Sequence, residues 1–214
     1  MSFKIDVPFS EKEQVKSLGA RWDAENKTWY VSDNLNINLF KNWLPSQEIT
    51  LIAKNPIYIG LNKQNCWKCK KDTPVISLGC KSFKVEELND DDELIWELNT
   101  DFSFFDYVEY IPNEIKNIVV DKFPFYKQAF SKTVKSTYWI NHCIHCSSIQ
   151  GDHFLHNEPD RAFFPTDVQS ARVLTLLRMN LKYDAGLICG YSYCTANELI
   201  LKYSPKMAIE SYLP

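Results

Sequence analysis

The sequence has no long apolar run. No stretch reaches the ~20 consecutive apolar residues that a membrane-spanning helix requires, and residues 1–6 contain no apolar segment typical of a secretion signal. Apolar residues make up 45% and charged residues 24% of the 214 residues, which is the balance of a folded globular protein. We therefore expect no membrane partner and a cytoplasmic location.

The sequence also lacks the short motifs of common catalytic and nucleotide-binding sites. It contains no P-loop pattern, no G-x-G-x-x-G, no G-x-S-x-G and no H-E-x-x-H. No small-molecule substrate can be identified from such patterns. These absences favour a non-enzymatic protein.

Basic residues are nearly missing from one segment. Residues 86–121 carry twelve acidic side chains and one basic side chain, although the whole chain has a net charge of only −3. A charge run of this kind is usually a solvated surface. The alternative is an acidic face that binds a basic protein partner, as an interaction or immunity-type protein would, or that mimics nucleic acid.

Two short cysteine pairs are the strongest positive signal. They are Cys66 with Cys69 and Cys143 with Cys146, each with the C-x-x-C spacing of a metal-binding turn. Four thiolates form the tetrahedral set that Zn²⁺ prefers, so the spacing predicts one structural zinc site. The rival interpretation is two unrelated reduced or redox pairs. The other cysteines, Cys80, Cys189 and Cys194, are expected to be small buried apolar side chains.

Histidines crowd the second cysteine pair. His142, His145 and His153 are expected to lie beside the zinc site and to support it by hydrogen bonds. One histidine could instead replace a cysteine ligand or bind a second metal. Asp152 followed by His153 also resembles part of an HNH-type nuclease site, which needs a further helical His or Asn, such as Asn197. A metal-dependent nuclease is therefore kept as a less favoured alternative.

The pattern of apolar residues predicts an α+β protein in two units. Residues 1–48 read as a strand-helix-strand-helix module, with Ser10 capping the first helix and Asn34 the second. Residues 49–214 read as a zinc-ribbon-like domain. The cysteine pairs are separated by 73 residues, so we expect an acidic insertion at about 80–136. Helices are expected at about 125–133, 167–183 and 197–201.

The first unit resembles a known family. Val7-Pro8-Phe9, the run from Leu18 to Asp23, and the run from Lys27 to Val31 are similar to a small bacterial domain of unknown function, DUF5710. That domain occurs in primase-like, topoisomerase-like and conjugation proteins. A fainter similarity is to the HARP module of DNA-annealing helicases. The resemblance implies DNA handling by a bacterial or phage-borne protein.

A nucleic-acid surface on this unit would combine cations with aromatic rings. Lys16, Arg21 and Lys27 would bind phosphates, and Trp22 and Trp29 would stack on bases of single-stranded or duplex nucleic acid. The alternative is structural. In it, both tryptophans fill the small core, and Arg21 pairs with a nearby acid.

The second unit resembles a family of uncharacterised bacterial proteins. The resemblance rests on Cys66-Trp67-Lys68-Cys69, on Thr73-Pro74-Val75 and on two later runs, 138–146 and 150–155. It implies zinc binding and no assigned activity. Members of that family usually carry glycine where this chain has Ser147, a difference that would loosen the turn and leave the ligands intact.

Overall fold

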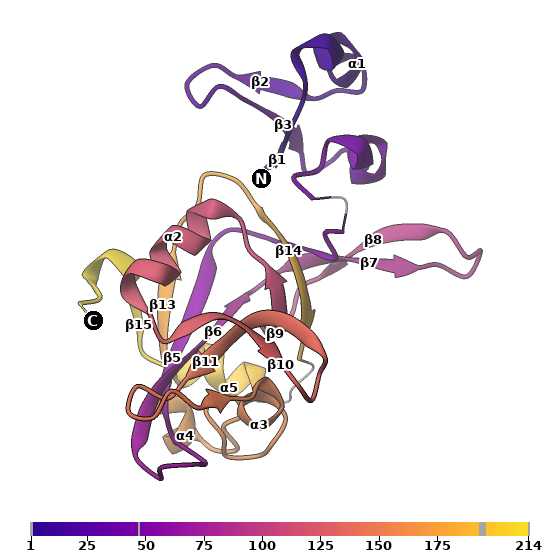
Figure 1. Ribbon diagram of the computed structural model, residues 1–214. Helices are drawn as coiled ribbons and strands as arrows, with labels where there is room; N and C mark the ends of the chain where they lie inside the picture. The colour runs from indigo at the N-terminus through magenta and orange to yellow at the C-terminus, as the bar shows by residue number, and fades with distance from the viewer. Residues whose placement is uncertain (1, 47, 193–195, 214) are drawn as a thin grey trace.

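The structure, a computed structural model, describes residues 2–46, 48–192 and 196–213 (Figure 1). Its described residues form two three-stranded sheets and one nine-stranded sheet, with short helices around them. The protein is therefore a mixed α+β protein, as the sequence predicts. No helix in these ranges is both long and apolar enough to cross a membrane.

The N-terminal module is built on the sheet β1-β3-β2. Its elements are β1 (Ser2–Ile5), η1 (Phe9–Glu11), α1 (Lys12–Ser17), β2 (Arg21–Asp23), β3 (Thr28–Ser32) and η2 (Ile37–Trp43). Alternate residues of β1, Phe3 and Ile5, point into a small core that also contains Val15, Phe40 and Trp43. This core continues into the larger domain through Ile49 and Ile52.

Two local predictions for this module were wrong, and one strand was not predicted. The segment Arg21–Asp23, expected only to lead into a turn at 25–27, is strand β2, because all three residues pair with β3. The second helix is a 3₁₀ helix, and its cap is Asn36, whose side chain accepts from the Asn38 amide at 3.0 Å. Ser10 caps nothing, because it lies inside η1.

The nine-stranded sheet has the order β15-β13-β5-β6-β9-β14-β4-β7-β8. Its strands are β4 (Leu51–Ala53), β5 (Ile57–Asn65), β6 (Asp72–Cys80), β7 (Phe83–Leu88), β8 (Leu94–Asn99), β9 (Ser103–Tyr110), β13 (Thr175–Met179), β14 (Ala185–Tyr191) and β15 (Lys206–Ala208). All neighbours run antiparallel except β13 and β15. Apart from the hairpins β5–β6 and β7–β8, neighbouring strands in this sheet are not consecutive in the sequence.

The segment expected as an insertion, 80–136, contributes directly to this sheet. It supplies β7, β8 and β9, and β9 lies between β6 and β14. Phe104 and Phe105 on β9 are buried on opposite faces, in separate clusters of the core. The segment therefore forms part of the main core.

Two predicted helices were wrong in the same way. The helix expected at 125–133 is strand β10 (Tyr126–Ser131), which pairs over its full length with β11 (Ser136–His142), and the helix of this segment is α2 (Asn113–Lys122). The helix expected at 167–183 is α4 (Val168–Val173) followed by β13. Strand pairing on both sides of β13, with β5 and β15, overrides the helical spacing of the apolar residues in the segment 167–183. The last expected helix is present as α5 (Asn197–Tyr203), and η3 (Ile209–Ser211) follows β15.

The N-terminal module is fixed to the larger domain by polar contacts. The Asp184 amide donates to the Ser2 carbonyl at 2.9 Å, beside a bridge between Phe3 and Asp184. Lys54, which is largely buried, forms ion pairs with Asp33 of the module and with Asp184. These contacts give the module a defined position against β4 and β14.

Candidate metal centre and aromatic hollow

The first cysteine pair lies in the tight turn of the β5–β6 hairpin. Inside this turn, the Cys66 amide donates to the Lys71 carbonyl and the Lys70 amide donates to the Cys66 carbonyl, both at 2.9 Å. Lys70 has a left-handed backbone with φ of +62°. This geometry turns the thiols of Cys66 and Cys69 toward the same point.

The second pair lies in an equivalent turn between β11 and β12 (Ile149–Gln150). The Cys143 amide donates to the Ser148 carbonyl and the Ser147 amide donates to the Cys143 carbonyl, again at 2.9 Å. Ser147 has φ of +58°, and it occupies the position that Lys70 occupies in the first turn. Its left-handed backbone explains why glycine suits this position.

The four sulfurs meet in space. Cys66 Sγ lies 3.6 Å from Cys146 Sγ, and Cys69 Sγ lies 3.6 Å from Cys143 Sγ. All four ligand atoms lie within 4.8 Å of one another. A tetrahedral zinc site with bonds of about 2.3 Å has sulfur–sulfur edges of about 3.8 Å, so these residues fit one metal ion and could hold it.

Protein contacts hold the two turns together around the sulfurs. The buried Asn141 side chain on β11 donates to the Ile76 carbonyl and accepts from the Ile76 amide on β6, both at 2.8 Å. The Ile144 amide donates to Thr73 Oγ1 at 3.1 Å. A metal bound here would therefore join two hairpins that already make direct hydrogen bonds.

Hydrogen bonds to three of the sulfurs favour the thiolate form that a metal requires, whereas burial and the neighbouring thiols raise the pKa of Cys69 to about 11. Ser148, through its hydroxyl and then its backbone amide, lowers the pKa of Cys146 to about 6. The Gln150 side-chain amide donates to Cys66 Sγ and the His145 backbone amide donates to Cys143 Sγ, both at 3.4 Å. Thiolates with such donors are good ligands.

The remaining cysteines lie away from this cluster where the structure describes them. Cys80 is fully buried, and burial raises the pKa of its thiol to about 12. Cys189 is half-buried beside the main core. Cys194 lies outside the described residues.

The histidines near the second pair have different surroundings. His145 Nε2 lies 3.0 Å from the Asp72 carbonyl oxygen, which links the second turn to the first. His142 is buried, its Nδ1 lies 2.9 Å from the Ile140 carbonyl oxygen, and burial lowers its pKa. His153 is exposed on α3 (Asp152–His156), where its ring contacts the Phe154 ring. His156 is buried against the Phe163 ring.

Asp152 and His153, the neighbouring residues of the nuclease hypothesis, differ in burial. The Asp152 carboxylate is buried and accepts from the Tyr107 amide at 2.8 Å. Burial, with the nearby Asp106, raises the pKa of Asp152 to about 7. His153 beside it faces solvent, and Asn197 begins helix α5. The nuclease hypothesis stays a prediction.

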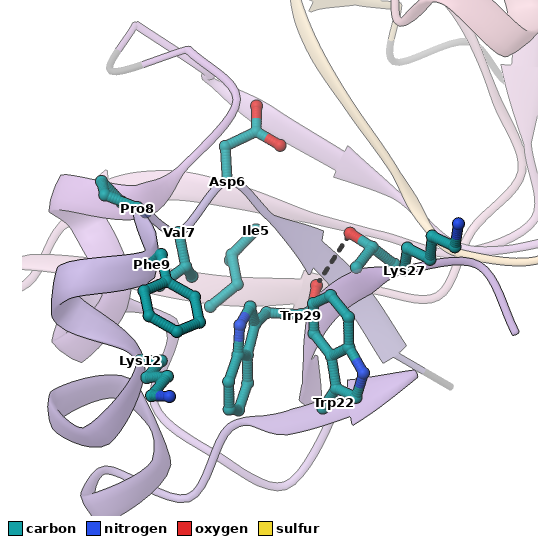
Figure 2. A pocket seen from close by; sticks show the side chains of 10 residues that line it. Ile5, Asp6, Val7, Pro8, Phe9, Lys12, Trp22, Lys27 and Trp29 are labelled. Atoms are coloured by element: carbon teal, nitrogen blue, oxygen red, sulfur yellow. Dashed lines mark hydrogen bonds between the residues drawn. The ribbon is translucent and has the colours of Figure 1, made fainter. Parts of the chain in front are cut away.

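A second feature is a hollow of about 770 Å³ on the N-terminal module (Figure 2). The aromatic residues on its lining are Phe9, Trp22 and Trp29. Phe9 is 81% exposed and Trp22 is 50% exposed, whereas Trp29 packs partly against the module's core. The Trp22 and Trp29 rings lie 5.6 Å apart, so two of the three rings support each other.

Two lysines accompany these rings. Lys12 Nζ lies 4.0 Å from the centre of the Phe9 ring, in cation–π geometry. Lys27 also lines the hollow, at the turn between β2 and β3. The structure thus brings together the predicted Trp22, Lys27 and Trp29. Phe9 and Lys12 were missed in the sequence; Phe9 stands directly after Pro8 and begins η1, which has no buried residue.

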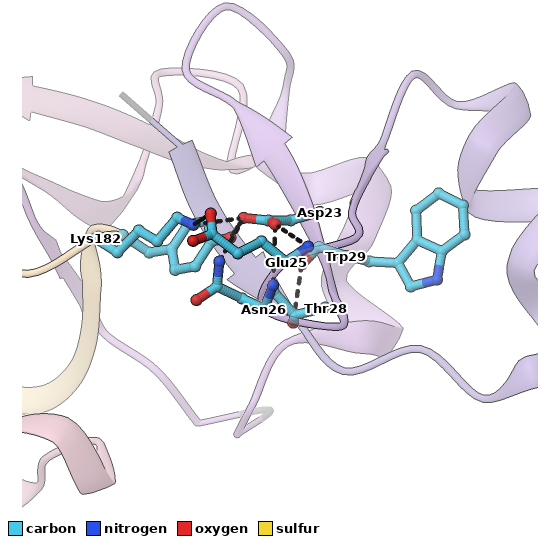
Figure 3. Close-up of polar contacts among 7 residues, drawn as sticks. Asp23, Glu25, Asn26, Thr28, Trp29 and Lys182 are labelled. Carbon is cyan, nitrogen blue, oxygen red and sulfur yellow. Dashed lines mark hydrogen bonds and ion pairs between the residues drawn. The ribbon is translucent and has the colours of Figure 1, made fainter.

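The other predicted cations lie outside this lining. Lys16 is exposed on α1 and Arg21 is exposed on β2. The acids near Arg21 in sequence bind the larger domain (Figure 3): Lys182 Nζ lies 3.0 Å from Asp23 and 3.2 Å from Glu25. The Tyr183 hydroxyl also donates to Asp23 and, with these neighbours, holds the pKa of Asp23 below its usual range.

Comparisons with known proteins concern the N-terminal module. Residues 3–45 match the family described as Domain of unknown function (DUF5710), which confirms the resemblance stated for that segment. Two curated Escherichia coli proteins, each named DNA primase TraC, are 46% identical to this chain over 39 residues. The match covers 18% of this chain and 4% and 3% of those proteins. No solved structure matches the chain.

Proposed function

We propose that this protein is a non-enzymatic nucleic-acid-binding protein whose fold is stabilised by a structural zinc ion. The observation that carries the proposal is the aromatic hollow, in which Phe9 and Trp22 remain largely exposed next to Lys12 and Lys27. Large exposed aromatic side chains lose the free energy of burial, so a cluster of them favours a binding surface.

The chemistry of the hollow suits an unpaired strand. Bases stack on exposed aromatic rings, and each stack contributes about 1–3 kcal/mol. In a duplex the flat faces of the bases are already covered, so a stacking surface selects single strands. The ammonium groups of Lys12 and Lys27 would neutralise the neighbouring phosphates.

The comparisons support the same ligand class. The segment that lines the hollow falls within residues 3–45, and the curated relatives of this region are named as DNA primases. The shared segment is a small fraction of those proteins, so we infer an accessory DNA-binding role and carry over no primase activity.

Zinc is the metal that the ligand set favours. Four thiolates in a tetrahedral cluster are typical of structural zinc sites. Four protein ligands leave no open position for a substrate or a water molecule. We therefore assign the ion a role in stability, with no role in the chemistry of a reaction.

The test is a titration of the full-length protein with a fluorescent oligothymidylate of about 12 nucleotides, followed by anisotropy. We expect binding that weakens as salt rises from about 50 to 200 mM. Trp22→Ala should weaken binding by about 5- to 160-fold, the equivalent of one lost stack. Replacing Lys12 and Lys27 together by alanine should reduce the salt slope by about 1.4.

Phe130→Ala is the matched control. Phe130 is 58% exposed, similar to Trp22, but it lies on β10 outside the module. Its replacement should leave the affinity unchanged. Absence of binding by the wild type at low salt would refute the proposal, as would equal losses from Trp22→Ala and Phe130→Ala.

A further inference from the structure

The β7–β8 hairpin projects from the body of the protein (Figure 1). Strand β8 is the last strand of the nine-stranded sheet, so within the described residues no further strand pairs with its outer edge. An open edge presents backbone donors and acceptors that can pair with another chain. The hairpin therefore has the basic requirement of a strand-docking site.

Backbone geometry shows which groups face outward. The Asn89 amide donates to the Glu93 carbonyl at 2.9 Å, so this pair closes the hairpin. In an antiparallel ladder bonded and non-bonded pairs alternate, which places Trp96 and Leu98 in non-bonded pairs with β7. In agreement, the amide of Glu86, the residue opposite Trp96, donates to the Thr50 carbonyl on the side of β7 that faces away from β8.

A contact with the N-terminal module also shows that the backbone groups of alternate β8 residues face away from β7. The Leu94 carbonyl, two residues before Trp96, accepts from the Asn38 side chain of the N-terminal module at 2.7 Å. The outer edge of β8 is therefore covered at Leu94. The outward amide and carbonyl groups of Trp96 and Leu98 continue the same edge beyond that contact.

Several of the exposed side chains of the hairpin are apolar. Leu88 is 65% exposed and Leu98 is 52% exposed, and Leu94 and Ile95 are exposed as well. These side chains belong to a strand pair, where apolar residues normally cover a core. Their exposure on an open edge predicts a partner that covers them.

Charge limits what that partner can be. Seven acids stand on residues 83–99: Glu86, Glu87, Asp90, Asp91, Asp92, Glu93 and Glu97. The one basic residue, Lys84, already pairs with Asp33. A second copy of this hairpin would place two acidic ribbons side by side, and nucleic acid would also be repelled. The complementary occupant is an extended segment with basic side chains.

We propose that β8 is a docking strand for a basic, extended segment of a partner protein, which adds to the sheet by pairing with Trp96 and Leu98. Backbone hydrogen bonds would fix the register. Apolar side chains of the added strand would cover Leu94 and Leu98, and its lysine or arginine residues would face the acids. This surface is separate from the aromatic hollow and does not depend on nucleic-acid binding.

The probe for this proposal is a synthetic ten-residue peptide of alternating lysine and valine, titrated into the full-length protein by calorimetry. We expect micromolar binding at about 50 mM salt, with slower hydrogen exchange of the Trp96 and Leu98 amides. The matched ligand control is the same peptide with alternate backbone amides N-methylated. It has the same side-chain charges but cannot pair, and we expect it to bind about tenfold more weakly.

Protein variants separate the backbone from the charges. Leu98→Pro removes the outward amide at a position where an edge strand tolerates proline, and it should weaken binding about tenfold. Leu98→Ala keeps the amide and is its control. Changing Asp90, Asp91 and Asp92 together to asparagine should weaken binding several-fold at low salt.

Three results would overturn the proposal. Equal binding of the methylated and unmethylated peptides would show that charge alone attracts the probe. Equal binding of an alternating glutamate–valine peptide would exclude charge selection. If the wild type binds no peptide and the triple asparagine variant dimerises in sedimentation, the acids act only to keep the open edge from self-pairing.

Discussion

The left-handed backbone of Ser147 leads to a quantitative prediction. At φ of +58° an L-residue costs roughly 1–2 kcal/mol relative to glycine. Replacing Ser147 by glycine removes this cost. The greater conformational freedom of glycine in the unfolded chain takes back about 0.4–1 kcal/mol of the gain. Ser147→Gly should therefore raise the free energy of unfolding by up to about 1.6 kcal/mol, and by about 0.8 kcal/mol at the midpoints of these ranges.

Urea unfolding of the protein in buffer that contains zinc, followed by circular dichroism, measures this change. Ser147→Ala is the control, because alanine has the same backbone cost as serine, and its stability should stay within about 0.5 kcal/mol of the wild type. Lys70→Gly, at φ of +62° in the first turn, should give a gain like that of Ser147→Gly. A loss of stability in both glycine variants would refute the reasoning about the two turns.

Three further predictions concern the buried core and the attachment of the module. Burial raises the pKa of Asp152 to about 7 from 3.8, so its contribution to stability is present below pH 3.8 and is lost as pH rises through 7. Asp152→Asn should thus exceed the wild type in urea unfolding at pH 8 by about 4 kcal/mol at most, and by less at pH 5. Gly79→Ala should destabilise the folded protein by about 1–3 kcal/mol, since the added Cβ would lie 2.5 Å from the Ser103 carbonyl oxygen. Gly151→Ala is the control, because its added Cβ would lie 3.9 Å from the nearest atom, in the Phe154 ring. Lys182→Ala should lower the free energy of unfolding by under about 1 kcal/mol in the same assay, because the Lys182 side chain is about half exposed and solvent screens its ion pairs.

The metal-binding turns could be predicted from the sequence because their geometry is local. A C-x-x-C spacing alone brings two thiols together, so Cys66 with Cys69 and Cys143 with Cys146 needed little other information. The partnership between the two pairs depends on long-range contacts such as that of Asn141 with Ile76. Only the preference of zinc for four ligands made it predictable.

The main sheet could not be predicted in the same way. The segment 167–183 carries apolar residues at helical spacing, but its part Thr175–Met179 is strand β13. The strand conformation depends on β5 and β15, which are more than 100 and about 30 residues away in sequence. The acidic charge of 86–121 also concealed β9, whose buried aromatic residues decide its place. In the hollow, Trp22 and Trp29 could be proposed as stacking residues from their residue types. Whether their side chains are exposed depends on the fold and could not be predicted.

The central claim is that Cys66, Cys69, Cys143 and Cys146 together hold one zinc ion that joins two hairpins. Metal analysis of the purified wild type beside Cys143→Ser and Cys189→Ser tests it most directly. We expect one zinc per chain in the wild type and in Cys189→Ser, and little or none in Cys143→Ser, which should also unfold more easily. A stably folded wild type that binds no zinc, or a Cys143→Ser variant that keeps one zinc per chain, would contradict the claim.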